Sequence, residues 1–200
     1  HVSSAIAVEI IRAAKARGVR VTAEAGPHHF TLTDEALMVF GTNAKMNPPL
    51  RTAADLAGVR QGLADGTLDA IASDHAPHSA DEKAVDMVDA PCGIIGLETA
   101  LGLVWTELVK PRVLTPLQAV AKLTSVPASI MGLNKGTLAV GADADITIFD
   151  PHTQWQVNPN QFYSKARNTP FSGRRLTGLV KATIVGGALV FHNGKIVAGS

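Results

Sequence analysis

Residues 68–78, LDAIASDHAPH, form the stretch of sequence that decides the fold. Leu68–Ser73 is a short, largely apolar run of the kind that forms a buried parallel strand. Asp74 and His75 follow directly at the point where this strand ends. In a barrel of alternating strands and helices, the carboxyl ends of the strands converge on the face that carries the active site. The run therefore predicts an α/β fold in which Asp74 faces a site.

Helices and strands alternate on both sides of this run. Hydrophobic spacing, caps and turn residues predict helices over 5–17, 34–40, 52–63, 97–109 and 115–125, and a strand over 19–25. The first helix places Ile6, Ile10, Ala13 and Ala14 on one face, which predicts an amphipathic helix. About 20 residues rich in Asp, Pro and Gly follow His75, and a loop of that length favours a binding role.

The pattern changes at Gly136, where short alternating runs separated by Gly, Pro and Asn-Gly begin. These runs are ADITIFD, TQWQV, GLVKATIVGG and ALVFHNGK, and they are typical of a strand-rich subdomain. We therefore expect two parts: βα units over 1–135 and a β-rich C-terminal subdomain over 136–200.

Composition excludes several classes of function. The 200 residues are 46% hydrophobic and 18% charged, which predicts a globular domain with one substantial core. A formal net charge of +1 without a Lys/Arg run gives no reason to expect nucleic acid or an anionic membrane as a partner. No uninterrupted apolar run is long enough for a membrane span. Cys92 is the single cysteine, so we expect a soluble, cytoplasmic protein without an intrachain disulfide.

Two residues are candidate metal ligands. An aspartate at the end of a strand, such as Asp74, can bind a divalent metal and accept a proton from water, although it can equally cap a helix. His1 stands at a helix entrance, where histidines more often cap or pack than bind metal, and its spacing leaves both roles open. Since the chain begins with His rather than Met, we expect it to be part of a longer protein.

Other polar residues lie in loops. His28 and His29 are adjacent, so both cannot easily face one metal. One of them can contact the site while the other is structural, and the structural interpretation is favoured. Asn47 lies in the stiff loop KMNPPLR, where its amide can donate and accept hydrogen bonds, as the edge of a cyclic imide or urea requires. Asn-Pro is also a common turn, which is the alternative interpretation.

Six motifs occur in a fixed order along the chain: HVSS, PHHFTLTDE, KMNPPLR, SDHAPH, PCGIIGLET and NTPFSG. In this order and spacing the chain resembles the C-terminal portion of type I dihydroorotases, and GADADITIFD is similar to the β-sandwich tail of the wider amidohydrolase superfamily. The resemblance covers essentially the whole chain. It implies the C-terminal part of a metal-dependent (β/α)8 TIM-type barrel followed by a small β-sandwich subdomain.

The resemblance also implies a site with two zinc ions in the complete enzyme. His1 would be a ligand of the second metal, and Asp74 would be a ligand of the first metal and the catalytic acid/base. Asn47, His78 and the backbone at Cys92 and Gly93 would contact the substrate. The family's paired H-x-H ligands, its bridging ligand and its carboxylate-binding Arg and Asn all precede position 1.

The activity implied is reversible hydrolysis of (S)-dihydroorotate to N-carbamoyl-L-aspartate in pyrimidine biosynthesis, with the 200 residues inactive on their own. Besides this small-molecule substrate, a homodimer and a complex with aspartate carbamoyltransferase are the expected partners. Two alternatives stay open: a non-catalytic dihydroorotase-like scaffold for aspartate carbamoyltransferase, and a related dihydropyrimidinase or allantoinase. Retention of His1, Asp74 and His78 favours the enzyme over the scaffold.

Overall fold

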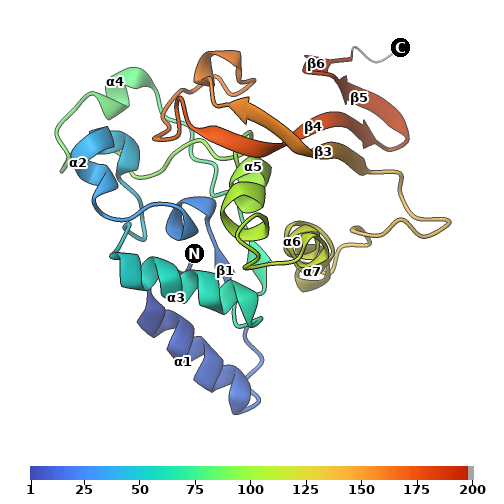
Figure 1. Ribbon diagram of the computed structural model, residues 1–200, viewed down its shortest axis with the longest axis horizontal. Helices are drawn as coiled ribbons and strands as arrows, with labels where there is room; N and C mark the ends of the chain where they lie inside the picture. Colours follow the sequence, from blue (N-terminus) through green and yellow to red (C-terminus); the bar gives the residue numbers. More distant parts are fainter. Residues whose placement is uncertain (198–200) are drawn as a thin grey trace.

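The computed structural model describes residues 1–197 and has an α/β architecture (Figure 1). Two short parallel strands, β1 and β2, lie among helices in the first part of the chain, and an antiparallel sheet of four strands closes the chain. The α-helices are α1 (Ala5–Ala16), α2 (Ala36–Phe40), α3 (Ala53–Ala64), α4 (Ala80–Lys83), α5 (Ala100–Val104), α6 (Pro116–Leu123) and α7 (Ser125–Ile130). The strands are β1 (Glu24–Ala25), β2 (Ala70–Ile71), β3 (Ile146–Gln156), β4 (Arg175–Val185), β5 (Ala188–His192) and β6 (Lys195–Ile196).

Short 3-10 and π turns connect these elements. The 3-10 turns are η1 (Pro27–Phe30), η2 (Gly41–Ala44) and η4 (Pro159–Gln161), and the π turn is η3 (Trp105–Val109). The turn η3 continues α5 directly, so the helix predicted over 97–109 begins only at Ala100 and widens at Trp105.

Parallel pairing runs through the first part of the chain. Glu24 pairs with Ala70 and Ala25 with Ile71, and the N–H of Val2 donates to the carbonyl of Glu24 at 2.8 Å. Beyond β2, His75 forms a parallel bridge with Ile94. The segments at β1, β2 and Ile94 thus run in the same direction, which is the arrangement that βα units produce, and Val2 is hydrogen-bonded to the first of them. The strand expected over 19–25 pairs only at its last two residues, so that prediction was too long.

Helix α1 packs on α3 through two glycines (Figure 1). A side chain at Gly58 would stand 2.5 Å from the Cβ of Ala5, and one at Gly62 would stand 2.7 Å from Val8. This close approach buries the Val8 side of α1. Ile6 and Ile10, which the sequence placed on the apolar face of this helix, are 70% and 63% exposed. The expected apolar face therefore does not pack against the described residues.

Side-chain caps fix the beginnings of several helices. Ser4 accepts a hydrogen bond from the N–H of Ala7 and Thr52 accepts one from Asp55, each of a type that stabilises a helix by about 1 kcal/mol. Thr33, expected to cap a helix over 34–40, does not do so, and α2 begins at Ala36 without a side-chain cap. Thr115 caps α6 as its sequence predicts, but a second helix, α7, follows that the sequence did not indicate.

The strand-rich tail is a single antiparallel sheet in the order β3-β4-β5-β6. The runs ADITIFD and TQWQV, expected as separate strands, join in β3, which stays paired with β4 across two register shifts. Residues 136–197 contain this sheet alone, so the second sheet that a sandwich would require is not among them. Figure 1 shows α5 and the turn that follows it lying against this sheet, where Trp105 meets Phe149 edge to face at 4.8 Å.

Two apolar clusters form the core. The first joins α1, α3 and β2 to η3 through Val8, Val59, Leu63, Leu68 and Leu108. The second lies beneath the loops after β2 and includes Met46, Leu50, Ile94, Phe171 and Leu176. Lys122 of α6 is also buried, and its ammonium donates to the carbonyl of Leu68 at 2.6 Å. None of the helices within residues 1–197 combines the length and apolar character that crossing a bilayer demands.

Candidate active site

His1 and Asp74 meet at the carboxyl ends of the parallel segments. Nε2 of His1 lies 3.3 Å from Oδ1 of Asp74, although 73 positions separate the two residues in the chain. Nδ1 of His1 contacts Oε1 of Glu24 at 2.9 Å, so the strand β1 orients the ring and turns Nε2 toward Asp74. A carboxylate on the far nitrogen is the usual device for fixing a ligand histidine.

His28 approaches the same aspartate from η1. Its Nε2 lies 3.6 Å from Oδ2 of Asp74, is buried, and has no hydrogen-bond partner among the described residues. Burial lowers the pKa of His28 to about 3, so the ring stays neutral at pH 7, the form in which an imidazole nitrogen can bind a metal ion. His29 points elsewhere, and its Nε2 contacts the carbonyl of Pro48 at 2.9 Å. Of the two adjacent histidines, only His28 reaches the site.

Asp74 itself has an unusual backbone. Its φ of 49° lies in the left-handed region that few residues other than glycine adopt, and burial raises the pKa of its carboxyl above the ordinary value. Strained backbone of this kind gathers at functional sites, where surrounding contacts hold it in place. A raised pKa suits a carboxylate that must take up and release a proton.

The other predicted residues form a second group around the loop after β2. His78 Nε2 lies 3.0 Å from the carbonyl of Cys92, and the N–H of Gly93 donates to the carbonyl of Lys45 at 2.8 Å. Gly93 has a φ of 110°, and a side chain there would stand 2.5 Å from Ala76. The structure therefore brings His78, Cys92 and Gly93 together.

Asn47 is not hydrogen-bonded to this second group of candidate residues in the part of the chain that the structure describes. It is exposed, two residues beyond Lys45, and no hydrogen bond within residues 1–197 joins its side chain to the other candidate residues. The peptide bond between Asn47 and Pro48 is cis, and the carbonyl of Pro48 faces His29. The loop KMNPPLR is thus tied to the site through the Lys45 carbonyl, which accepts from the N–H of Gly93, rather than through the Asn47 amide.

Two cavities flank these groups. One of about 440 Å³ opens beside His1 and Glu24 and is lined by Val2, by Ile11 of α1 and by the segment 21–23 that precedes β1. The other, also about 440 Å³, is lined by His78, Lys83 and Asn168 among others. Sequence patterns did not single out Glu24, Lys83 or Asn168, because their contacts depend on partners distant in the chain, and for His28 they favoured a structural role.

The donor atoms of His1 and Asp74 suit a metal ion. An imidazole nitrogen and a carboxylate oxygen are both zinc donors, and Nε2 of His1 and Oδ1 of Asp74 face the same space at 3.3 Å. Nε2 of His28, which has no hydrogen-bond partner among the described residues, lies 3.6 Å from the other carboxylate oxygen of Asp74, Oδ2, and is a further nitrogen donor at this place. Within the described 197 residues, however, no three or more His, Cys, Asp or Glu side chains are arranged to hold an ion. The two residues fit as part of a ligand set.

The model of the amidohydrolase family matches residues 1–197. The chain belongs to the amidohydrolase family. This amidohydrolase is 63% identical over 193 residues to a dihydroorotase from Pelotomaculum thermopropionicum, and 55% identical over 192 residues to one from Syntrophotalea carbinolica. Each match covers 96% of this chain but 45% of the relative, so the chain spans less than half the length of these curated relatives.

Solved structures show the same architecture. The L-hydantoinase (dihydropyrimidinase) from Arthrobacter aurescens superposes with a TM-score of 0.92 at 32% identity, over 99% of this chain and 45% of that one. The dihydropyrimidinase from Brevibacillus agri gives a TM-score of 0.93 at 30% identity, over 98% of this chain and 45% of that one. The amidohydrolase described here thus corresponds to somewhat less than half of these larger hydrolases.

Proposed function

We propose that these residues are the C-terminal portion of a dihydroorotase, which hydrolyses (S)-dihydroorotate reversibly to N-carbamoyl-L-aspartate in pyrimidine biosynthesis. The identity of 63% to the dihydroorotase of P. thermopropionicum is the observation that carries this proposal. The pairing of His1 with Asp74 supports it, because a metal-dependent hydrolase needs ligand side chains at the carboxyl ends of its parallel strands.

The proposal includes the architecture of the complete protein. The parallel segments at β1, β2 and Ile94, together with the segment at Val2 that is hydrogen-bonded to β1, would be consecutive strands of a TIM-type (β/α)8 barrel, and residues 1–135 would be its C-terminal part. Residues 136–200 would be the β-rich subdomain, whose sheet would complete a sandwich with strands from elsewhere in the protein. The apolar cavity beside Val2 and Ile11 would be filled by the preceding barrel units.

His1 and Asp74 would hold two zinc ions together with ligands from the rest of the protein. When bound, such ions lower the pKa of a water molecule and polarise the amide carbonyl of the substrate. The carboxylate of Asp74 would take a proton at its Oδ atoms and deliver it to the departing ring nitrogen, a role that its raised pKa supports. Glu24 would keep Nε2 of His1 facing the site.

Asn47, His78 and the backbone of Cys92 and Gly93 would bind the substrate. His78 Nε2 already faces the Cys92 carbonyl, so its contribution would be to orient the substrate and the loop rather than to move protons. We further propose a cytoplasmic enzyme, with a homodimer and a complex with aspartate carbamoyltransferase as its protein partners.

A related cyclic amide hydrolase is the second candidate, because the solved structures that superpose on this chain are titled hydantoinase and dihydropyrimidinase. Their identities of 32% and 30% are about half the 63% shared with the P. thermopropionicum dihydroorotase, which favours dihydroorotate as the substrate. A scaffold without activity would not need the alignment of His1 with Asp74.

A substrate panel tests the proposal. Full-length protein containing these residues would be assayed with dihydroorotate, dihydrouracil, hydantoin and allantoin after loading with zinc. We expect turnover of dihydroorotate with a kcat/KM far above that for the other three compounds. Preference for hydantoin or dihydrouracil would assign the second candidate, and no turnover of any compound by a zinc-loaded protein would favour the scaffold.

A further inference from the structure

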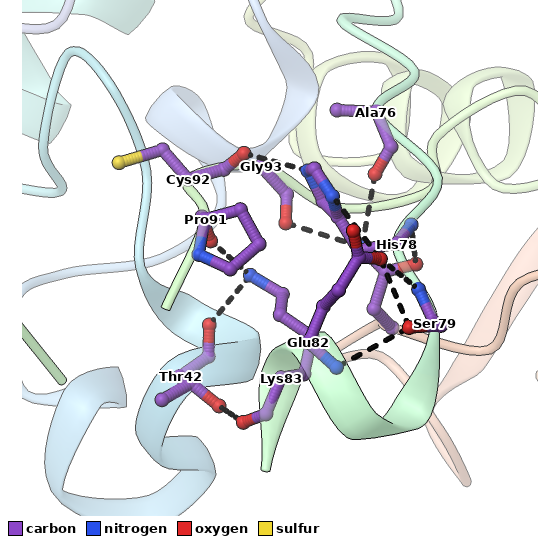
Figure 2. A network of polar contacts seen from close by, with 10 residues as sticks. Thr42, Ala76, His78, Ser79, Glu82, Lys83, Pro91, Cys92 and Gly93 are labelled. Atoms are coloured by element: carbon purple, nitrogen blue, oxygen red, sulfur yellow. Dashed lines mark hydrogen bonds and ion pairs between the residues drawn. The ribbon is translucent and has the colours of Figure 1, made fainter. Parts of the chain in front are cut away.

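Three consecutive carbonyl groups each meet a side-chain nitrogen in the segment Pro91–Gly93, here called the carbonyl strip (Figure 2). Lys83 Nζ donates to the carbonyl of Pro91 at 2.7 Å, and His78 Nε2 lies 3.0 Å from that of Cys92. Asn168 Nδ2 donates to the carbonyl of Gly93 at 3.2 Å. Because every carbonyl of the strip is held from outside, its backbone has little freedom to rotate.

Lys83 is a buried lysine whose ammonium is held by backbone carbonyls instead of a carboxylate. It is 6% exposed, and no carboxylate in the described part of the chain forms an ion pair with it. Its ammonium donates instead to the carbonyls of Pro91 and Thr42, and burial lowers its pKa. A buried charge is costly unless hydrogen bonds compensate it. The two hydrogen bonds of the Lys83 ammonium therefore offset the cost of burying the charge, and they join η2 to the beginning of the carbonyl strip.

Asn168 holds the other end of the strip. It is 5% exposed, and its Oδ1 accepts from the N–H of His78 at 3.2 Å, while Nδ2 donates to Ala76 at 2.9 Å as well as to Gly93. An amide can donate and accept at the same time, which these contacts require. Asn168 thus fixes the strip relative to the segment that carries Asp74 and His78.

We propose that Lys83 and Asn168 are positioning residues that set the shape of the carbonyl strip for substrate binding. The inference rests on the proposed function, in which the backbone of Cys92 and Gly93 contacts the substrate ring. Neither residue has to touch the substrate, since both act through the strip and through His78. Loss of either one should misplace the strip while His1 and Asp74, which lie outside this network, keep their arrangement.

The kinetic test uses the zinc-loaded full-length protein with Lys83→Met and Asn168→Ala. The matched control is Lys122→Met, because Lys122 is also a buried lysine held by backbone carbonyls, those of Leu68 and Asp69, away from the strip. We expect KM for dihydroorotate to rise about tenfold or more in the two strip variants, with zinc content unchanged, and to stay the same in the control. Lys83→Arg, which keeps a cationic donor, should recover part of the loss and serves if Lys83→Met does not fold.

Hydrogen exchange provides a measurement that does not depend on activity. Peptides covering residues 91–95 should exchange faster in Lys83→Met and Asn168→Ala than in the parent, and at an unchanged rate in Lys122→Met. If the parent turns over no dihydroorotate, the proposed function fails and exchange alone decides the inference. Unchanged exchange in both strip variants would overturn it, and so would a stability loss equal to that of the control without a change in KM.

Discussion

Nε2 of His1 lies 3.3 Å from Oδ1 of Asp74, and the second nitrogen of the same ring contacts Glu24 at 2.9 Å. The N-terminal segment, β1 and the residue Asp74 beyond β2 therefore meet in one series of side-chain contacts. Such a series holds His1 in one orientation before any metal binds, because each ring nitrogen already has a carboxylate beside it.

Asp74→Asn in the zinc-loaded full-length protein should leave the fold intact and lower kcat for dihydroorotate by about 10²- to 10⁴-fold, because an amide cannot accept the proton. Circular dichroism and zinc analysis establish that the variant is folded and metallated before its turnover is measured. Turnover close to that of the parent in such a preparation would remove Asp74 from the catalytic role.

His78→Ala should lower kcat/KM by about tenfold through the loss of the contact with the Cys92 carbonyl at 3.0 Å. Zinc stoichiometry should not change, because His78 faces the carbonyl strip rather than His1. Atomic absorption and steady-state kinetics measured on the same sample check both statements. Loss of zinc would make His78 a ligand instead.

Gly93→Ala should lower the free energy of unfolding by more than the about 1–3 kcal/mol expected for backbone strain alone. Its φ is 110°, and the new methyl group would stand 2.5 Å from that of Ala76. Gly66→Ala is the matched control, since Gly66 has a φ of 83° with no atom within 4 Å of the added carbon. Urea denaturation that gives equal losses for both variants would contradict the close packing at Gly93.

The burial of Lys122 should make the free energy of unfolding depend on pH. Burial lowers its pKa in the folded protein below the ordinary value of 10.5, which the unfolded chain retains. Between these two values the unfolded state binds more protons, so the Lys122 contribution to stability increases as the pH rises toward 10.5. The unfolding free energy of the parent minus that of Lys122→Met should therefore increase from pH 7 to pH 10 in urea titrations. A constant or decreasing difference would show that the ammonium is not desolvated.

Residues 1–200 expressed alone should bind zinc poorly and hydrolyse no dihydroorotate. His1 and Asp74 are the two proposed ligands within this chain, whereas a catalytic zinc usually takes three protein ligands and water. Zinc is measured after dialysis, with the full-length protein treated identically as the reference. One zinc or more per chain with measurable turnover would mean that the site is complete within these residues.

Local signals made part of the fold predictable. The largely apolar run before Asp74 and the caps at Ser4 and Thr52 act over a few residues, and β2, α1 and α3 are present where these signals indicate. The alternation over 19–25 was misleading, because only Glu24 and Ala25 find partners in β2. How far a parallel strand extends depends on its neighbour, and a single segment of sequence does not contain that information.

The sequence indicated Asp74 and His1 as site residues, but it did not indicate the tertiary contacts that hold the site in place. Asp74 was indicated by its place after a strand, and the role of His1 came from a resemblance rather than from spacing. Lys83 follows Asp81 and Glu82 in a charged run, which is typical of an exposed helix, yet it is buried. Its environment is created by Thr42 and Pro91, and such tertiary contacts leave no periodic trace in the sequence.

The bonds of Asn168 have a consequence for synthesis on the ribosome. They span 90, 92 and 75 positions back to His78, Ala76 and Gly93. Contacts of such long range form late, because the intervening chain must first be brought together, and a protein emerges from its N-terminus onward. The helices around β1 and β2 can assemble while translation continues. The carbonyl strip, however, reaches its final arrangement only after Asn168 has been synthesised, 75 positions after Gly93. A nascent chain that stops before Asn168 therefore lacks a finished site, however well its earlier elements have folded.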